Sequence, residues 1–148
     1  AVAYQMITVL PTVPQISVLL DEIPEAQREV LAFWLSFWRG HRATLLRGRL
    51  EGDHPEALYS SVRMTGENER IVIAYTDPTA VLPAQGALYV CNATGGDKIC
   101  LLGGGNPRGC RVTVRGYNGS VISEADANLT AGGVCVFSVP AGGMLEVH

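Results

Sequence analysis

The three histidines, His41, His54 and His148, are the first candidates for acid–base or metal chemistry. They form no HExxH motif and no serine lies in a GxSxG turn, so the sequence gives little support to zinc hydrolysis or serine catalysis. His41 stands beside Arg42 late in a helical stretch, where a positive charge interacts favourably with the negative end of the helix dipole. We therefore expect His41 to act at a helix end.

Two further segments resemble ligand sites only in part. Residues 53–56 (DHPE) bring three potential metal ligands together, but no fourth ligand recurs at a partner spacing. Residues 101–109 are rich in glycine, yet they lack the GK[ST] ending of a phosphate loop, and a strand is expected to follow them. We expect two polar loops, with no metal and no cofactor.

Paired carboxylates are the groups that hydrolyse glycosides, and they must face each other across a cleft. The acidic residues Asp21, Glu22, Glu25 and Glu29 instead gather around a predicted helix start, where the helix dipole already accounts for them. No catalytic residue is therefore assigned, and the residues of any binding site stay unknown.

The four cysteines, Cys91, Cys100, Cys110 and Cys135, match neither a zinc site nor a dense disulfide framework in their spacing. We expect free, partly buried thiols. Glycosylation motifs begin at Asn92, Asn118 and Asn128, but asparagine beside glycine, serine or threonine is also common in turns, and we favour that interpretation.

The 148 residues fit one domain, or one small domain with an appendage, and exclude a complete barrel enzyme. The net charge is −3 without a run of like charge, which argues against nucleic acid and anionic membranes as partners. Apolar residues make up 47% of the chain and charged residues 17%, so a disordered chain is excluded, and part of the apolar surface is expected to meet a partner.

The first third of the chain predicts a helix, a break, a strand and a long helix. Residues 1–10 are apolar, but they lack a basic leader and end at Pro11, so they fit neither a signal peptide nor a membrane span. A short buried helix, a strand at 15–20 and a cytoplasmic location are expected. Residues 24–46 have apolar side chains on most of the helix circumference, which predicts a helix packed between two layers.

Beyond Gly48 the sequence predicts an antiparallel β-sandwich, making the protein mainly β. The expected strands are 59–64, 70–75, 86–91, 98–102, 111–115, 121–123, 133–139 and 144–147. Alternation places Cys110, Val112 and Val114 inward, and Cys135 on the same face as Phe137. The pair Asn118-Gly119 predicts a type I′ hairpin turn.

Several segments resemble α-galactosidases of glycoside hydrolase family 36, the melibiase type. Three segments and Gly48 resemble the end of that family's catalytic barrel: 13–18 (VPQISV), 23–25 (IPE) and 35–46 (LSFWRGHRATLL). Three later segments resemble its C-terminal sandwich: 73–75 (IAY), 88–95 (LYVCNATG) and 139–144 (VPAGGM). Family 31 barrel glycosidases share the VPAGG ending and remain an alternative.

The resemblance implies a parent enzyme that cleaves terminal α-galactosides with retention of anomeric configuration, through two catalytic aspartates. In that family both aspartates lie on earlier barrel strands, and no position in this sequence matches either motif. Residues 1–46 would then be the end of the barrel, and residues 47–148 would form the sandwich. The chain would be a non-catalytic part of the enzyme that stabilises the barrel and contributes to a homo-oligomer. Phe33, Trp34, Phe37 and Trp38 would pack between the parts, and without the barrel they would form an exposed, self-associating patch. A carbohydrate-binding module and a structural domain unrelated to sugars are the alternatives.

Overall fold

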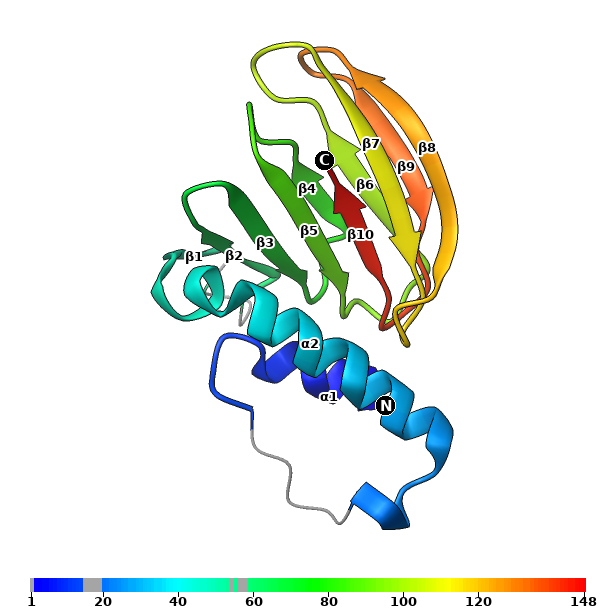
Figure 1. Ribbon diagram of the computed structural model, residues 1–148. Coiled ribbons are helices and arrows are strands. Elements are labelled where there is room, and N and C mark those ends of the chain that lie inside the picture. The colour runs from blue at the N-terminus through cyan, green and yellow to red at the C-terminus, as the bar shows by residue number, and fades with distance from the viewer. Residues whose placement is uncertain (1, 15–19, 54, 56–58) are drawn as a thin grey trace.

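The computed structural model describes residues 2–14, 20–53, 55 and 59–148. These residues form three layers, with two helices on one face of a seven-stranded sheet and a three-stranded sheet on its other face (Figure 1). One cluster of buried side chains lies between the helices and the large sheet, and a second lies between the two sheets. The predicted mainly β sandwich, preceded by helices, is therefore confirmed.

The helices begin and end close to the predicted positions. Helix α1 (Val2–Val9) buries Ala3, Met6 and Ile7. Helix α2 (Glu25–Arg47) follows Pro24, whose fixed φ suits a helix start, and carries an acid in its first turn and a base in its last. Of the strand expected at 15–20, residues 15–19 lie outside the described residues, and Leu20 opens the short 3-10 helix η1 (Leu20–Glu22).

The strands form two sheets in the following spatial order. The large sheet contains β1 (Arg49–Asp53), β2 (Ser61–Thr65), β3 (Glu69–Ala74), β5 (Ala87–Asn92), β10 (Met144–Val147), β7 (Arg108–Arg115) and β8 (Val121–Leu129), and the small sheet contains β4 (Thr79–Val81), β6 (Lys98–Leu102) and β9 (Val134–Ser138). Most neighbours are antiparallel, as predicted, whereas β3 with β5 and β4 with β6 are parallel. The parallel pairs arise because the chain alternates between the sheets from β3 to β6.

Two of these strands were not expected from the sequence. Strand β1 lies before the first strand expected from the sequence, and it pairs along its whole length with β2. Strand β4 has only three residues and pairs with β6. Both are strands because of the neighbour that they pair with, since their own residues carry little β pattern.

The predicted alternation in the sandwich is confirmed by burial. Cys110, Val112 and Val114 on β7 belong to the cluster between the sheets. Cys135 and Phe137 on β9 pack against the same cluster, while the intervening Val136 is exposed. The thiols at 110 and 135 are thus part of the sandwich core.

The hairpin between β7 and β8 lies where it was predicted, but its turn is of another type. A type I′ turn needs positive φ at both central residues, and here Gly119 has φ of 87° while Asn118 does not have positive φ. Gly119 donates its N–H to the Gly116 carbonyl at 3.0 Å, and Gly116 donates to the Ser120 carbonyl at 2.9 Å. This is the pattern of a type I turn followed by a glycine in the left-handed region.

Gly119 should tolerate a side chain poorly, because helix α2 packs directly on this turn. A Cβ at this position would lie 2.1 Å from Cδ1 of Phe33, in addition to the strain of its positive φ. We expect Gly119→Ala to lower the free energy of unfolding by about 3 kcal/mol, measured by urea denaturation. Gly132→Ala is the matched control, since Gly132 also has positive φ (74°) but no atom within 4 Å of its Cβ, and it should lose only about 1 kcal/mol. Equal losses would show that the contact with Phe33 is unimportant.

Candidate functional site

The aromatic face of α2, formed by Phe33, Trp34, Phe37 and Trp38, is packed into the molecule. Trp34 is fully buried and Phe37 is 7% exposed, while Phe33 and Trp38 are half-buried. The prediction of an exposed apolar patch at these four residues is therefore wrong. The reason is that the large sheet and the segment containing α1 already cover most of the rings.

Two indole hydrogen bonds fix this face between its neighbours. Trp34 Nε1 donates to the carbonyl of Tyr117 in the β7–β8 turn at 3.0 Å, and Trp38 Nε1 donates to the carbonyl of Thr12 after α1 at 2.8 Å. Trp34 also meets Phe37 edge to face, with ring centroids 5.9 Å apart. The aromatic face thus joins the helical segment to the sandwich.

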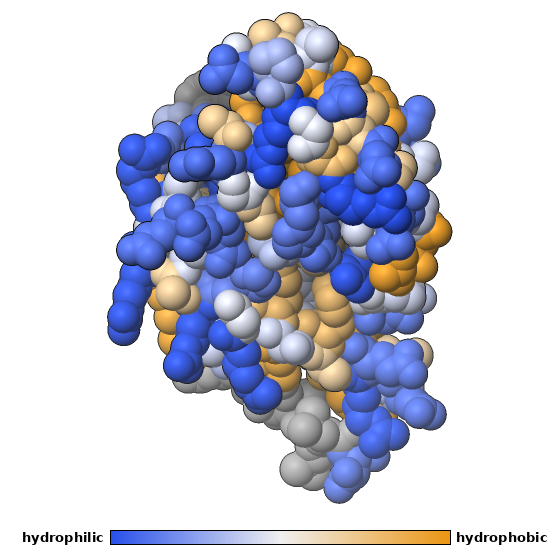
Figure 2. All heavy atoms as spheres, turned by 45° about the horizontal axis from the view of Figure 1, so that its top comes forward, coloured by the Kyte–Doolittle hydropathy of each residue, from blue (hydrophilic) through white to orange (hydrophobic). Residues whose placement is uncertain are grey.

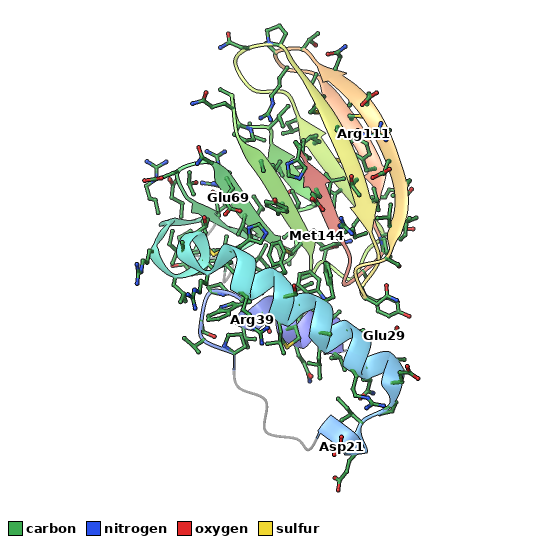
Figure 3. The ribbon with its side chains drawn as sticks, viewed as in Figure 1. Asp21, Glu29, Arg39, Glu69, Arg111 and Met144 are labelled. Atoms are coloured by element: carbon green, nitrogen blue, oxygen red, sulfur yellow. The ribbon has the colours of Figure 1, made fainter. Side chains whose placement is uncertain are left out.

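A polar cluster lies beside this face, where the C-terminal half of α2 meets β3. His41 Nδ1 lies 2.5 Å from Glu69 Oε2, and the Thr44 hydroxyl donates to Glu69 Oε1 at 3.1 Å. Figure 3 shows Glu69 on the sheet next to α2. His41 was expected to act at the helix end, but it lies more than one turn before Arg47 and pairs with a carboxylate from another element instead.

The polar cluster continues across the sheet through β5, β10 and β7. Arg115 Nε donates to Glu146 Oε2 at 2.7 Å, and His148 Nε2 lies 2.8 Å from Glu146 Oε1. The Tyr89 ring lies between the two imidazoles, with centroids 4.5 Å from His41 and 5.9 Å from His148. A chain of side chains therefore links α2 with four strands.

The carboxylates of this cluster are each hydrogen-bonded within it. Each carboxylate is engaged by a base, and among the described residues no hydroxyl or thiol is hydrogen-bonded to either imidazole. The arrangement therefore contains neither the nucleophile–base pair of covalent catalysis nor a pair of free carboxylates for glycoside hydrolysis. On the face that Figure 2 shows, hydrophilic residues cover most of the surface, and hydrophobic residues lie between them and along one side.

Glu146 should make the stability depend on pH. Burial acts to raise the pKa of Glu146, but hydrogen bonds from Arg115 and His148 outweigh it and lower the pKa below 4.5. Because the folded-state pKa is depressed, this stabilisation is present above the unfolded pKa and is lost as the pH falls through the folded pKa. We expect the unfolding free energy to fall below about pH 4.5, and less steeply in Glu146→Gln, measured by urea denaturation across pH.

Glu124→Gln is the control for this prediction. Glu124 is half-exposed and lies 3.5 Å from Arg111, so its loss should leave the pH profile close to that of the unmodified protein. If Glu146→Gln also leaves the profile unchanged, the ion pair with Arg115 does not stabilise the fold.

The remaining candidates from the sequence are not brought together as a site. Of residues 53–56, His54 and Glu56 lie outside the described residues, and Asp53 accepts hydrogen bonds from Ser61 and Arg63. In the glycine-rich segment, Arg108 opens β7 and donates to the Pro83 and Gly86 carbonyls at 2.8 Å. Within the described ranges, no three His, Cys, Asp or Glu residues are placed to hold a metal ion.

The four cysteines are free thiols, two of them buried and two half-buried. Burial raises the pKa of Cys91 far above its ordinary value, and burial also raises the pKa of Cys110. A thiol held in its neutral form is a poor nucleophile, so these two cysteines act as small apolar core residues.

Asn92, the first residue of a glycosylation motif, is fully buried and joins three segments of the sandwich. Its Nδ2 donates to the carbonyls of Gly96 at 3.0 Å and Val139 at 2.9 Å, and its Oδ1 accepts the N–H of Thr94 at 3.1 Å. Asn118 makes the same turn with Ser120 on the surface. The turn interpretation is confirmed for Asn92 and Asn118, but it is wrong for Asn128, which lies within strand β8 and pairs with Gly109 of β7.

A groove of about 410 Å³ lies between the start of α1, the first turns of α2 and the loops that follow β5 and precede β10. Its lining is mainly apolar, with Tyr4 and Tyr117 on its sides and Gly142 on the loop before β10. Both tyrosines are about half exposed. The groove is thus an open apolar surface at the joint between the helices and the sandwich.

Comparisons of the chain with protein-family models, with curated proteins and with solved structures gave no match. Neither α1 nor α2, nor any other helix in the described part of the chain, has the length and apolarity needed to cross a membrane.

Proposed function

We propose that this chain is the non-catalytic C-terminal part of an α-galactosidase-like glycoside hydrolase, with α1 and α2 ending the catalytic barrel and the strands forming the sandwich packed on it. The observation that carries the proposal is the packing of α2. Its aromatic face is buried between the large sheet and the segment containing α1, so the helix links a sandwich to a helical layer.

Apolar side chains on and beside the two helices that are not fully covered support a further partner. Tyr4 is 50% exposed and Val13 is 64% exposed, and Leu31 and Leu35 on α2 are only partly buried. Removing apolar surface from water contributes about 25 cal/mol of favourable free energy per Å². A preceding barrel in the same polypeptide would cover these side chains and the groove beside α1.

Contacts between the segments that carry the family resemblance are a second support. Asn92, in the segment LYVCNATG, donates to the carbonyl of Val139, the first residue of VPAGGM. The two motifs thus form one structural unit, whose sequence is constrained by a buried polar side chain.

The absence of free carboxylate pairs in the polar cluster fits a supporting role, and activity is the direct test. The purified chain should not hydrolyse a nitrophenyl α-galactoside, whereas the full-length product of the same gene should. The gene should encode, before the codon for Ala1, barrel strands with the two catalytic aspartates. Enzyme-like turnover by the chain alone, or a gene without a barrel, would overturn the proposal.

A carbohydrate-binding module is the second candidate, and the placement of Tyr4 and Tyr117 on the sides of the groove favours it. Aromatic rings at an open groove can stack on sugar rings. Galactose and raffinose titrations followed by NMR of the tyrosine rings separate the two functions. A supporting domain gives no shifts at millimolar sugar. A binding module gives saturable shifts at both tyrosines, and in Tyr117→Ala the shift of Tyr4 is lost as well.

A further inference from the structure

Three of the four sheet edges in the described part of the chain are protected against pairing with another chain. Edge strand β1 carries Arg49, Glu51 and Asp53, and edge strand β8 carries Glu124 and Asp126. Edge strand β4 is only three residues long and lies between two prolines, at 78 and 83. Charge, short length and proline are the devices by which proteins block edge-to-edge association.

The fourth edge, β9, has none of these protections. Its sequence, VCVFS, contains no charge and no proline, and its β-branched residues suit a strand. Val134 is 62% exposed and Val136 is 55% exposed. An uncharged edge strand with exposed valines is a template for another strand.

The hydrogen bonds between β6 and β9 show which backbone groups of β9 point away from the sheet. Gly103 donates to the Gly133 carbonyl at 2.7 Å, and Val139 donates to the Asp97 carbonyl at 2.8 Å. Because the residues bonded to one neighbour alternate along an antiparallel strand, the odd-numbered residues of β9 bond to β6. The N–H and C=O groups of Val134, Val136 and Ser138 therefore point to the free edge, and no described residue pairs with them.

We propose that β9 pairs antiparallel with β9 of a second copy of this chain, about a two-fold axis at Val136. Val136 would then lie opposite its own counterpart, and Val134 opposite Ser138 of the other copy. All three residues present their backbone groups to the free edge, so each would donate and accept one bond. The two small sheets would join into one continuous sheet.

The charges on the edge strands favour β9 over β8 and β1 as the strand that pairs with its own copy. The same two-fold pairing of β8, about its central Ala125, would set Glu124 against Asp126 of the other copy, and pairing of β1 would set Glu51 against itself. Like charges directly opposite each other destabilise a strand pair. Only β9 is self-complementary in this respect.

The outer face of the small sheet adds apolar contact to this pairing. Val81, Leu102 and Val134 lie in register across its three strands, and Cys100 lies beside Val136. Joining two copies at β9 would continue these rows across the axis, with Val136 packed against its counterpart. Exposed apolar rows on a sheet face mark a surface that associates.

Sedimentation velocity of the full chain over a range of concentrations, with reductant present, tests the proposal. We expect a dimer, and we expect Val136→Lys to weaken it at least about tenfold, because two lysines would face each other at the axis. Ile122→Lys is the matched control: Ile122 is 57% exposed on the protected edge β8, and this variant should dimerise normally. Circular dichroism checks that each variant is folded.

Val136→Pro separates edge pairing from contact through the sheet face. It removes an N–H that points to the free edge and leaves the ladder with β6 intact, so the fold should persist while the dimer is lost. If Val136→Pro unfolds the protein, the dimerisation of Val136→Lys alone tests the proposal. A chain that stays monomeric at high concentration, or a dimer that Val136→Lys leaves unchanged, would overturn the proposal.

Discussion

Replacing Trp34 by alanine should lower the free energy of unfolding by about 4 kcal/mol, which is much of the stability of a domain this size. The indole is fully buried and contacts Phe33 and Phe37 edge to face, with centroids 5.0 Å and 5.9 Å away. The variant leaves a cavity between α2 and the sheet, and it removes the donor to the Tyr117 carbonyl. Urea denaturation followed by far-ultraviolet circular dichroism measures the loss.

Trp38→Ala is the matched control on the same helix. Trp38 is half-buried and donates one hydrogen bond to the carbonyl of Thr12, so we expect a loss of about 2 kcal/mol. If Trp38→Ala proves as costly as Trp34→Ala, then α2 is held chiefly by the segment containing α1 rather than by the sheet. That result would contradict the docking described above.

Asn92→Ala should cost about 3 kcal/mol, although the side chain is small. The substitution leaves the buried carbonyl of Val139 without its partner, and it also removes the bonds to the Gly96 carbonyl and the Thr94 N–H. Asn92→Asp should be worse, because a buried carboxylate would face those carbonyl oxygens. Thermal and urea unfolding of both variants give the comparison.

Asn118→Ala controls for the turn itself. Asn118 makes the same bonds to a serine two residues on, but at the surface, so its loss should cost no more than about 1 kcal/mol. Equal costs at the two asparagines would mean that the bonds of Asn92 to Gly96 and Val139 contribute little.

The helices could be predicted from the sequence because their signals are local. The apolar periodicity of 24–46 and the proline at its start define α2 without reference to the rest of the chain. The sequence predicted that the aromatic face would be exposed without a further domain. This was wrong because the surface that covers it comes from residues far along the chain, such as Tyr89 and Tyr117.

Strands whose stability comes from their neighbours were missed. Strand β1 has the sequence RLEGD, in which only Leu50 is apolar, and β2 makes it a strand. The parallel pairs could not be predicted, since local alternation does not reveal which sheet a strand joins. The prediction of a type I′ turn was wrong because the pair Asn118-Gly119 permits that turn type without requiring it.

The polar cluster had no signal in the sequence. His41 and Glu69 are 28 residues apart, and Arg115 and Glu146 are 31 apart, so no spacing rule connects them. Asn92 did carry a signal, because its motif is typical of a turn, but its burial follows from its place at the end of a central strand.

The position of β10 in the large sheet has a consequence for the order of folding. This strand follows the other nine described strands in the sequence, yet it lies in the middle of the sheet, between β5 and β7. Until residues 144–147 have left the ribosome, β5 and β7 each have an open edge and the sheet is divided into two parts. Formation of the complete sheet must therefore wait for β10, and a nascent chain or one shortened before residue 144 would expose two aggregation-prone edges that chaperones must cover.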